Sequence, residues 1–187
     1  ANAPPAIWMA GRGGGMVVRN NLFAGNQTVN TSHAAISLQL SSDESGYFIN
    51  NTVFHRPSSN ARAIAFLSYD DALWLMGNNI VWNEQGTAAL HLDVENDAIL
   101  IHNVLGARTG VAPSVEHDNL RIDPRFVDSS LGNYRLRADS PLIDMGDGEA
   151  GPGPGSADAA GRPRVVGGGV DIGAFEEQTG VFGDGFE

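Results

Sequence analysis

A short motif with two consecutive asparagines recurs along the first 105 residues and constrains the fold more than any other feature. Its copies are Arg19-Asn20-Asn21-Leu22, Ile49-Asn50-Asn51-Thr52, Gly77-Asn78-Asn79-Ile80 and, more loosely, Ile101-His102-Asn103-Val104. The second asparagine falls at positions 21, 51, 79 and 103, so the steps are 30, 28 and 24 residues. An internal period of this length is the signature of a repeat architecture.

A second motif keeps the same period. It has the form alanine, apolar, variable, apolar, and its copies are Ala6-Ile7-Trp8-Met9, Ala35-Ile36-Ser37-Leu38, Ala63-Ile64-Ala65-Phe66 and Ala89-Leu90-His91-Leu92. Fixed apolar positions that alternate with a variable one are typical of a strand with one buried face. Each repeat therefore contains at least two short strands.

Stacking the repeats at the strand spacing of about 4.8 Å aligns their apolar residues in columns. The three expected core columns are Val18, Phe48, Met76 and Leu100; Phe23, Val53, Val81 and Leu105; and Ile7, Ile36, Ile64 and Leu90. We therefore predict an all-β fold: a parallel β-helix of about four to five coils with a C-terminal cap. The general handedness of parallel crossovers makes it right-handed.

The second asparagine of each repeat forms a polar column of its own, which contains Asn21, Asn51, Asn79 and Asn103. Stacked side-chain amides can bond to the copies above and below, as they do in cross-β stacks. Asparagine also tolerates the left-handed backbone that a sharp bend between strands needs. We therefore expect a structural asparagine ladder at a corner of the coil.

Composition narrows the possible partners. The net charge is −11, all 11 basic residues are arginine, and there is no cysteine. Nucleic acid is not an expected partner, because binding it needs a basic surface. We expect no transmembrane segment, because no apolar run is long enough to span a bilayer. The fold must be stable without disulfides.

The sequence suggests four regions. Residues 1–5 read as a linker, 6–117 as the coils, 118–177 as a C-terminal coil and cap, and 178–187 as a tail. The repeat dissolves into a loop from residue 107 to 114. The short strands and turns after it are expected to cover the edge of the last coil.

The C-terminal motifs resemble a known group of proteins. They are Asp123-Pro124-Arg125-Phe126-Val127-Asp128, Gly132-Asn133-Tyr134-Arg135-Leu136, Ser140-Pro141-Leu142-Ile143-Asp144-Met145-Gly146, Gly161-Arg162-Pro163-Arg164 and Val170-Asp171-Ile172-Gly173-Ala174-Phe175-Glu176. This succession resembles the C-terminal end of bacterial secreted right-handed parallel β-helix repeat proteins, including polymorphic outer-membrane-protein-like and choice-of-anchor families. The asparagine coils resemble the pectate-lyase-like superfold, and residues 181–187 resemble a tail of exported Gram-negative proteins. The resemblance implies a secreted or surface location, but no single activity.

Two classes of function remain open. The first is a non-catalytic scaffold that binds a glycan or a surface protein through its loops, without a cofactor. In that case Trp8, Trp74 or Trp82 would be the side chains that stack on sugar rings. An uncovered first coil would also expose unpaired strand edges, which a coil from upstream or a second copy could cover end to end.

The second class is a polysaccharide lyase or a glycoside hydrolase that acts on acidic polysaccharide, with catalytic coils here or upstream. A lyase removes a proton beside a carboxylate that is neutralised by Ca²⁺ or arginine, and without lysine the base must be arginine. The candidates are Arg19 and Arg56, with Asp70 and Asp71 as the paired acids. Adjacent acids at a strand end more often form a turn.

The glycine-rich C-terminal region also contains candidate Ca²⁺ ligands. They are Asp144, Asp147, Asp158 and Asp171. Carboxylate oxygens are the ligands that this hard cation prefers. Their spacing matches no EF-hand loop, and acids that accept hydrogen bonds from turn amides explain the same pattern.

Overall fold

The computed structural model describes residues 7–11, 14–25, 34–41, 43–55, 62–68, 71–94 and 98–178. Within these ranges the chain forms strands and turns and no helix, so none of its described elements is a helix that could cross a membrane. Fourteen of the strands lie in three parallel sheets, and four form two antiparallel pairs.

The three parallel sheets are built from strands that recur in turn along the chain. Sheet 1 contains β1 (Ile7–Ala10), β4 (Ile36–Leu40), β7 (Arg62–Ser68), β10 (Ala89–Val94) and β13 (Ala107–Gly110). Sheet 2 contains β2 (Met16–Arg19), β5 (Ser45–Ile49), β8 (Leu73–Gly77), β11 (Ala98–Ile101) and β14 (Val115–His117). Sheet 3 contains β3 (Leu22–Ala24), β6 (Thr52–Phe54), β9 (Ile80–Trp82) and β12 (Val104–Leu105).

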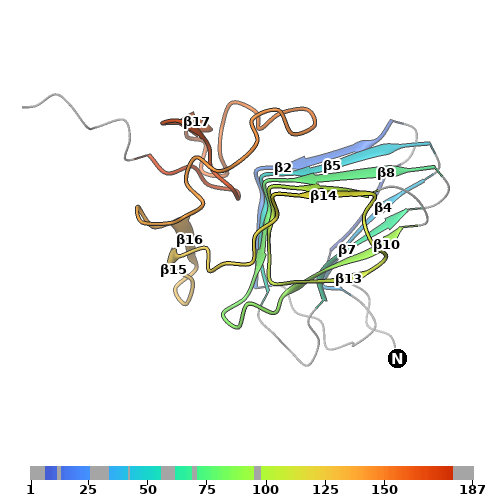
Figure 1. Ribbon diagram of the computed structural model, residues 1–187, viewed down its shortest axis with the longest axis horizontal. Coiled ribbons are helices and arrows are strands. Elements are labelled where there is room, and N and C mark those ends of the chain that lie inside the picture. The colour runs from blue at the N-terminus through green and yellow to red at the C-terminus, as the bar shows by residue number, and fades with distance from the viewer. Residues whose placement is uncertain are drawn as a thin grey trace, which may run out of the picture.

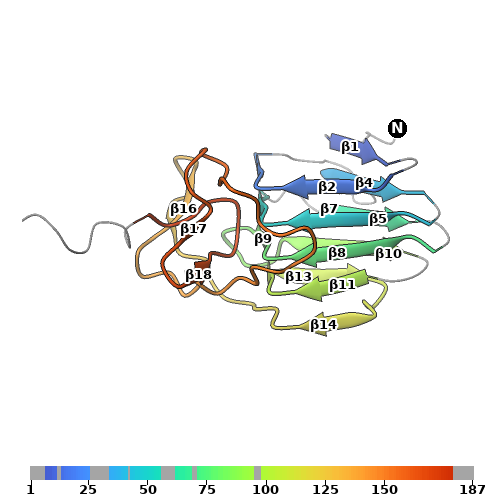
Figure 2. The same ribbon diagram turned by 90° about the horizontal axis from the view of Figure 1, so that it is seen from above.

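Each strand pairs with its equivalent one repeat later, which is the topology of a parallel β-solenoid. Figure 1 looks along the stack, where the coils superimpose as a frame, and Figure 2 shows them one above another. The register follows the three predicted columns, with Val18, Phe48, Met76 and Leu100 aligned in sheet 2. Their side chains are buried inside the frame, so the repeat period is the period of the core.

The fifth coil differs from the prediction that the repeat dissolves after residue 107. Strands β13 and β14 pair in parallel with β10 and β11, and Leu120 continues sheet 3 through a bridge to Val104. The apolar pattern is lost because this coil carries Arg108 and Glu116 in register with Leu90 and Leu100 of the core columns.

Arg108 and Glu116 form an ion pair across the end of the core. Their Nη2 and Oε2 atoms are 3.5 Å apart, and both side chains are partly exposed. A last coil has no neighbour on its outer side, so charged residues at core positions can stay in contact with water there. The last coil thus ends the apolar core itself.

The asparagine column forms a continuous ladder of hydrogen bonds. Asn51 donates from its backbone N–H and its side-chain amide to Oδ1 of Asn79, at 2.9 and 3.2 Å. The same pair of bonds joins Asn21 to Asn51 and Asn79 to Asn103. A fifth member, Asn119, accepts both bonds from Asn103 and was missed in the sequence. Because Asn51, Asn79 and Asn103 are fully buried, these bonds satisfy polar groups that have no access to water.

The repeat pattern predicts left-handed backbone at the ladder asparagines, but the structure has it one residue earlier in each coil. The residues with positive φ are Asn20 (56°), Asn50 (52°), Asn78 (57°), His102 (51°) and Asp118 (55°). We call these five residues the corner column, because they turn the chain from sheet 2 into sheet 3. The two consecutive asparagines therefore have different roles. The first bends the chain, and the second forms hydrogen bonds between neighbouring coils.

The C-terminal segment, residues 121–178, was expected to cover the edge of the last coil, but the structure places it elsewhere. It lies beside sheet 3, along the height of the stack (Figure 2). It contains the antiparallel pairs β15 (Phe126–Asp128) with β16 (Asn133–Leu136) and β17 (Val165–Val166) with β18 (Gly169–Val170). The reason is that sheet 3 is apolar on both faces: Ile80 and Val104 point outward and pack with Leu136, Leu142 and Ile172.

The corner column holds the C-terminal segment in place. The side chain of Asn20 donates to the carbonyl groups of Pro154 and Ala157, and that of Asn50 donates to the carbonyl of Asp171. Asn78 exchanges two bonds of 2.8 Å with the backbone of Asp147. The first asparagine of each pair thus bends its own coil and binds the outer layer.

The ladder predicts a position-dependent loss of stability. Replacing Asn79 with alanine would leave the buried backbone N–H of Asn51 unpaired and would remove the amide bonds to the carbonyl of Phe48 and to Oδ1 of Asn103. We therefore expect the free energy of unfolding to fall by about 2–5 kcal/mol. Replacing the exposed Asn21 should cost less than about 1 kcal/mol, because water can replace its amide. Urea unfolding of both variants measures the difference, and equal losses would contradict a ladder that stabilises through its buried members.

Candidate functional site

A cavity of about 590 Å³ lies between the end of sheet 3 and the β15–β16 hairpin. Its lining comprises Phe54, Trp82, Glu84, Gln85, Gly86, Arg121, Asp123, Arg125, Phe126, Ser129 and Arg137. These residues come from two coils, from the turn after β9 and from the C-terminal segment. The cavity therefore exists only where the outer layer meets the stack, and its volume is within the range of small-ligand sites.

One wall of the cavity is aromatic. Phe54 and Trp82 are the last residues of β6 and β9 and are aligned in register on sheet 3. Phe126 packs edge-on against Phe54, with ring centroids 5.9 Å apart. The turn after β9 brings Gly86 under the indole of Trp82, where a Cβ atom would lie 3.1 Å from the ring. Trp82 stays half-buried, so part of its ring remains available to a ligand.

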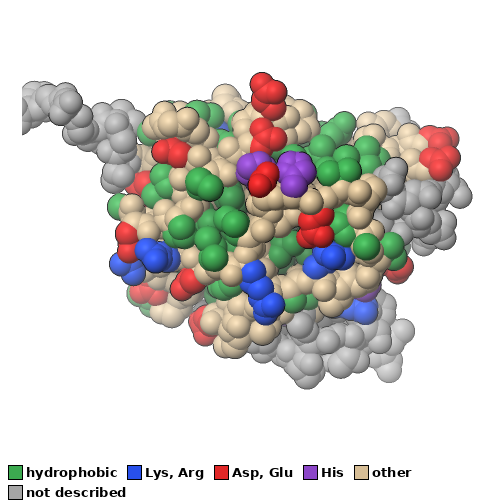
Figure 3. Space-filling view, in the orientation of Figure 1, with side chains coloured by type: hydrophobic (Ala, Val, Ile, Leu, Met, Phe, Trp, Pro, Cys, Tyr) green, Lys and Arg blue, Asp and Glu red, His purple; other side chains and the backbone are tan. Residues whose placement is uncertain are grey.

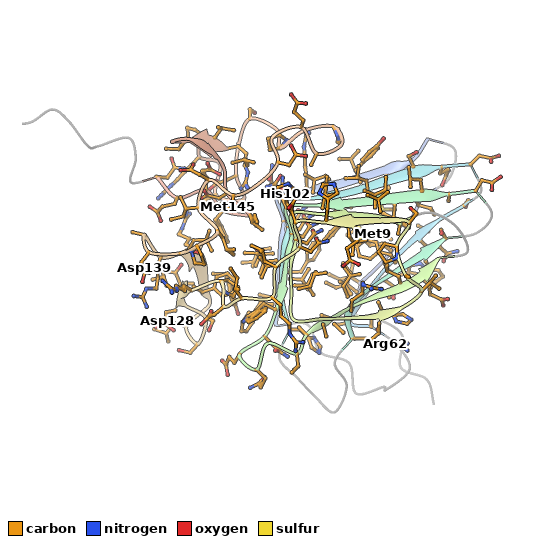
Figure 4. All side chains as sticks on the ribbon, in the orientation of Figure 1. Met9, Arg62, His102, Asp128, Asp139 and Met145 are labelled. Carbon is orange, nitrogen blue, oxygen red and sulfur yellow. The ribbon has the colours of Figure 1, made fainter. Side chains whose placement is uncertain are left out.

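The cavity lining also contains three arginines. Arg125 and Arg137 both bond to the carboxylate of Asp139, at 3.4 and 3.1 Å, and each side chain is about half exposed. Arg121 has no hydrogen-bond or ion-pair partner among the residues that the structure describes. Figure 3 shows basic side chains on this face between the coils and the C-terminal segment, and Figure 4 places Asp139 in that segment.

This combination suits a ligand with both polar groups and an apolar face. Guanidinium groups donate planar, paired hydrogen bonds that match carboxylates. Aromatic rings pack against the C–H face of a sugar ring and bury its apolar area. The cavity acids Glu84 and Asp123 can accept bonds from hydroxyl groups. The lining contains three arginines and two acids, whereas the whole chain has a net charge of −11.

The residues of the lyase hypothesis do not meet at this cavity. Arg19 ends β2 and reaches the carbonyl of Gly153 at 3.5 Å. Asp71 lies in the turn before β8, at the other end of sheet 2. Arg56 and Asp70 fall outside the described residues. Arg19 and Asp71 therefore do not form an acid–base pair.

The three tryptophans have three different environments. Trp74 is fully buried in the core, where its Nε1 donates to the carbonyl of Leu67 at 3.2 Å. Trp8 is 65% exposed on the outer face of β1. Only Trp82 lines the cavity, so it is the tryptophan best placed to stack on a ligand there.

The four aspartates proposed for Ca²⁺ bind backbone amides instead of converging. Asp144 accepts from the N–H groups of Gly168 and Gly169. Asp158 accepts from Ala160, Arg162 and Glu176, and Asp147 from Glu149. Asp171 accepts from Asp144 and Glu177. None of the four belongs to a group of three potential ligands in the described ranges.

A buried polar network joins the last motifs of the sequence. Arg164 is buried and donates to the carbonyl groups of Asp171 and Gly173, at 2.7 and 2.9 Å. Glu176 accepts from the N–H groups of Val166 and Asp171. Burial, followed by the nearby charge of Asp171, raises the pKa of Glu176 to about 7. These motifs therefore hold the outer layer together and do not line the cavity.

Sequence reasoning missed the cavity because its parts are far apart in the chain. Arg121, Arg125 and Arg137 belong to a segment that the sequence assigns to a cap. The available signal was the presence of four arginines, including Arg135, within 17 residues of an acidic chain. Their common direction depends on the hairpin and on its packing against sheet 3, which no local pattern encodes.

Comparison with known proteins gives no match: no protein-family model, curated protein or solved structure was found to be similar to this chain.

The raised pKa of Glu176 predicts a pH dependence of stability. The usual value is 4.5, so the folded chain holds this proton more tightly than the unfolded chain. Its contribution is present at low pH and is lost as the pH rises from 4.5 to about 7. We expect the free energy of unfolding to fall across this window. In Glu176→Gln the total fall should be smaller by an amount on the order of 2 kcal/mol.

Urea unfolding between pH 4.5 and 7.5 tests this expectation. The exposed Glu149 provides the matched control, because Glu149→Gln changes the same charge outside the network. Asp171, whose pKa burial also raises, leaves a residual slope of the same sign. Parallel curves for the wild type and Glu176→Gln would contradict the prediction.

Proposed function

We propose that this chain is a non-catalytic β-solenoid scaffold that binds an acidic saccharide in the cavity between sheet 3 and the β15–β16 hairpin. The observation that carries the proposal is the pairing of Trp82 and Phe126 with three arginines around one volume of about 590 Å³. A neutral sugar would need the aromatic wall alone. An inorganic anion would need the arginines alone.

Arg121 is the residue that we expect to recognise the ligand's carboxylate. Arg125 and Arg137 already share the carboxylate of Asp139, which holds them at the rim of the cavity. Arg121 has no such partner among the described residues, so its guanidinium can form a bidentate bond without breaking another. The sugar ring would then lie against Trp82.

The proposal extends to the class and location of the protein. The parallel sheets and buried asparagine bonds support a parallel β-helix of the pectate-lyase-like kind, and the general preference of parallel crossovers supports the right hand. On the sequence resemblance, we further propose that the protein is secreted or displayed on the cell surface of a Gram-negative bacterium, where it would meet acidic polysaccharides.

Binding to acidic oligosaccharides of defined length tests the proposal. We expect oligogalacturonate or oligomannuronate to bind in a salt-dependent way, and the methyl-esterified form of the same oligomer to bind more weakly. Arg121→Gln should weaken binding by about 10–100-fold, because a charged hydrogen bond contributes about 1.5–3 kcal/mol. Isothermal titration calorimetry measures both effects.

The matched control is Arg162→Gln, because Arg162 is also exposed on the C-terminal segment but lies outside the cavity lining. The same weakening in both variants would show general charge attraction and would contradict the site. Ultraviolet absorbance of the same mixtures, with and without Ca²⁺, detects unsaturated product. Its growth would replace the non-catalytic proposal with the lyase alternative.

A further inference from the structure

The corner column changes its chemistry at the last two coils. In the first three coils it contains asparagine, but the fourth has His102 and the fifth has Asp118. His102 still binds the C-terminal segment, because its Nδ1 lies 3.1 Å from the carbonyl oxygen of Met145. Figure 4 shows His102 and Met145 on facing sides of the corner. A carbonyl oxygen only accepts, so Nδ1 is the donor in this contact and Nε2 is the ring nitrogen left to bind a metal ion.

A second histidine completes a compact group of ligand atoms. His117 ends β14 and is paired in register with Ile101, so its ring lies beside that of His102, with centroids 6.1 Å apart. Oδ2 of Asp118 is 3.6 Å from Nε2 of His102 and 2.8 Å from Nδ1 of His117. One ligand atom from each of the three residues lies within 4.8 Å of the other two.

We propose that His102, His117 and Asp118 bind a divalent transition-metal ion of the Zn²⁺ class. Two imidazole nitrogens and one carboxylate oxygen are a donor set that suits this class better than Ca²⁺ or Mg²⁺, which prefer oxygen. Zinc lies about 2.0–2.2 Å from such ligands, so ligand atoms at these separations need only small side-chain rotations to meet it.

Three features of the fold support a site rather than a chance surface cluster. Residues 102 and 118 are held at equivalent corner positions of adjacent coils by the ladder bonds of Asn103 and Asn119. The bond to Met145 fixes the ring of His102, as partners outside the coordination shell do in metal sites. All three side chains are partly exposed, at 27%, 54% and 64% for His102, His117 and Asp118, which leaves room for water or another ligand on the metal.

The site is separate from the proposed saccharide cavity, because none of its three residues lines that cavity. Bound metal would join the fourth coil to the fifth, at the end of the stack where the apolar core gives way to the Arg108–Glu116 pair. We therefore expect metal to stabilise the last coil. This inference does not depend on saccharide binding.

Titration of the chelator-treated chain with Zn²⁺ tests the proposal. We expect one equivalent to bind, and the melting temperature to rise with zinc concentration. The decisive variant is His102→Asn, which restores the residue found at this position in the first three coils and thus keeps the bend and its bond to the outer layer. It should weaken zinc binding by at least about 100-fold, since loss of an outer partner alone costs about 10–100-fold.

His117→Ala and Asp118→Asn should weaken binding to a similar extent, while His91→Ala should leave it unchanged, because His91 bonds to Thr109 on sheet 1. Co²⁺ gives a second readout, since its visible absorption reports nitrogen and oxygen ligation directly. Zinc uptake without a one-to-one end point, or with the same affinity in His102→Asn, would overturn the proposal.

Discussion

The sharp corner between sheets 2 and 3 is the constraint on which the rest of the structure depends. A left-handed residue in every coil turns the chain within one position, and the asparagine that follows it bonds to the next coil. Because both requirements recur at the same place, the coils stack in one register and the core columns align behind them. The same corner residues reach outward and hold the C-terminal segment through Asn20, Asn50 and Asn78. A single local geometry therefore organises the coil, the stack and the outer layer.

The outer layer is a consequence of sheet 3, which is apolar on both faces. Inward residues such as Val81 join the core of the coils, and outward residues such as Ile80 need a second cover. The C-terminal segment supplies that cover and stabilises itself with buried polar bonds around Arg164 and Glu176. The cavity proposed for a saccharide forms where this cover meets sheet 3, because Trp82 of the sheet and Arg125 and Phe126 of the C-terminal segment line one volume. Binding is thus proposed at the junction of the layers, where the turn after β9 also lines the cavity.

Much of the solenoid could be predicted from the sequence, because its contacts repeat at a fixed separation. The three apolar columns and the asparagine column follow from residue spacing alone. The fifth coil could not be recognised, since Arg108 and Glu116 replace the apolar residues that mark a core column. The position of the C-terminal segment was missed for a different reason: adjacent apolar residues such as Ile80 and Val81 indicate a strand that is buried on both sides, but not which segment covers it.

The residues of the two candidate sites could not be grouped from the sequence. The sequence by itself determined the coil period, the strand registers and the residue types at the corner, because each of these depends on contacts between equivalent positions. Only the tertiary structure decided that Arg121 and Arg137 share a cavity with Trp82, and that His102, His117 and Asp118 meet at one corner. These groupings depend on how a non-repeating segment packs against a repeating one and on where the stack ends, and neither has a period that can be read along the chain.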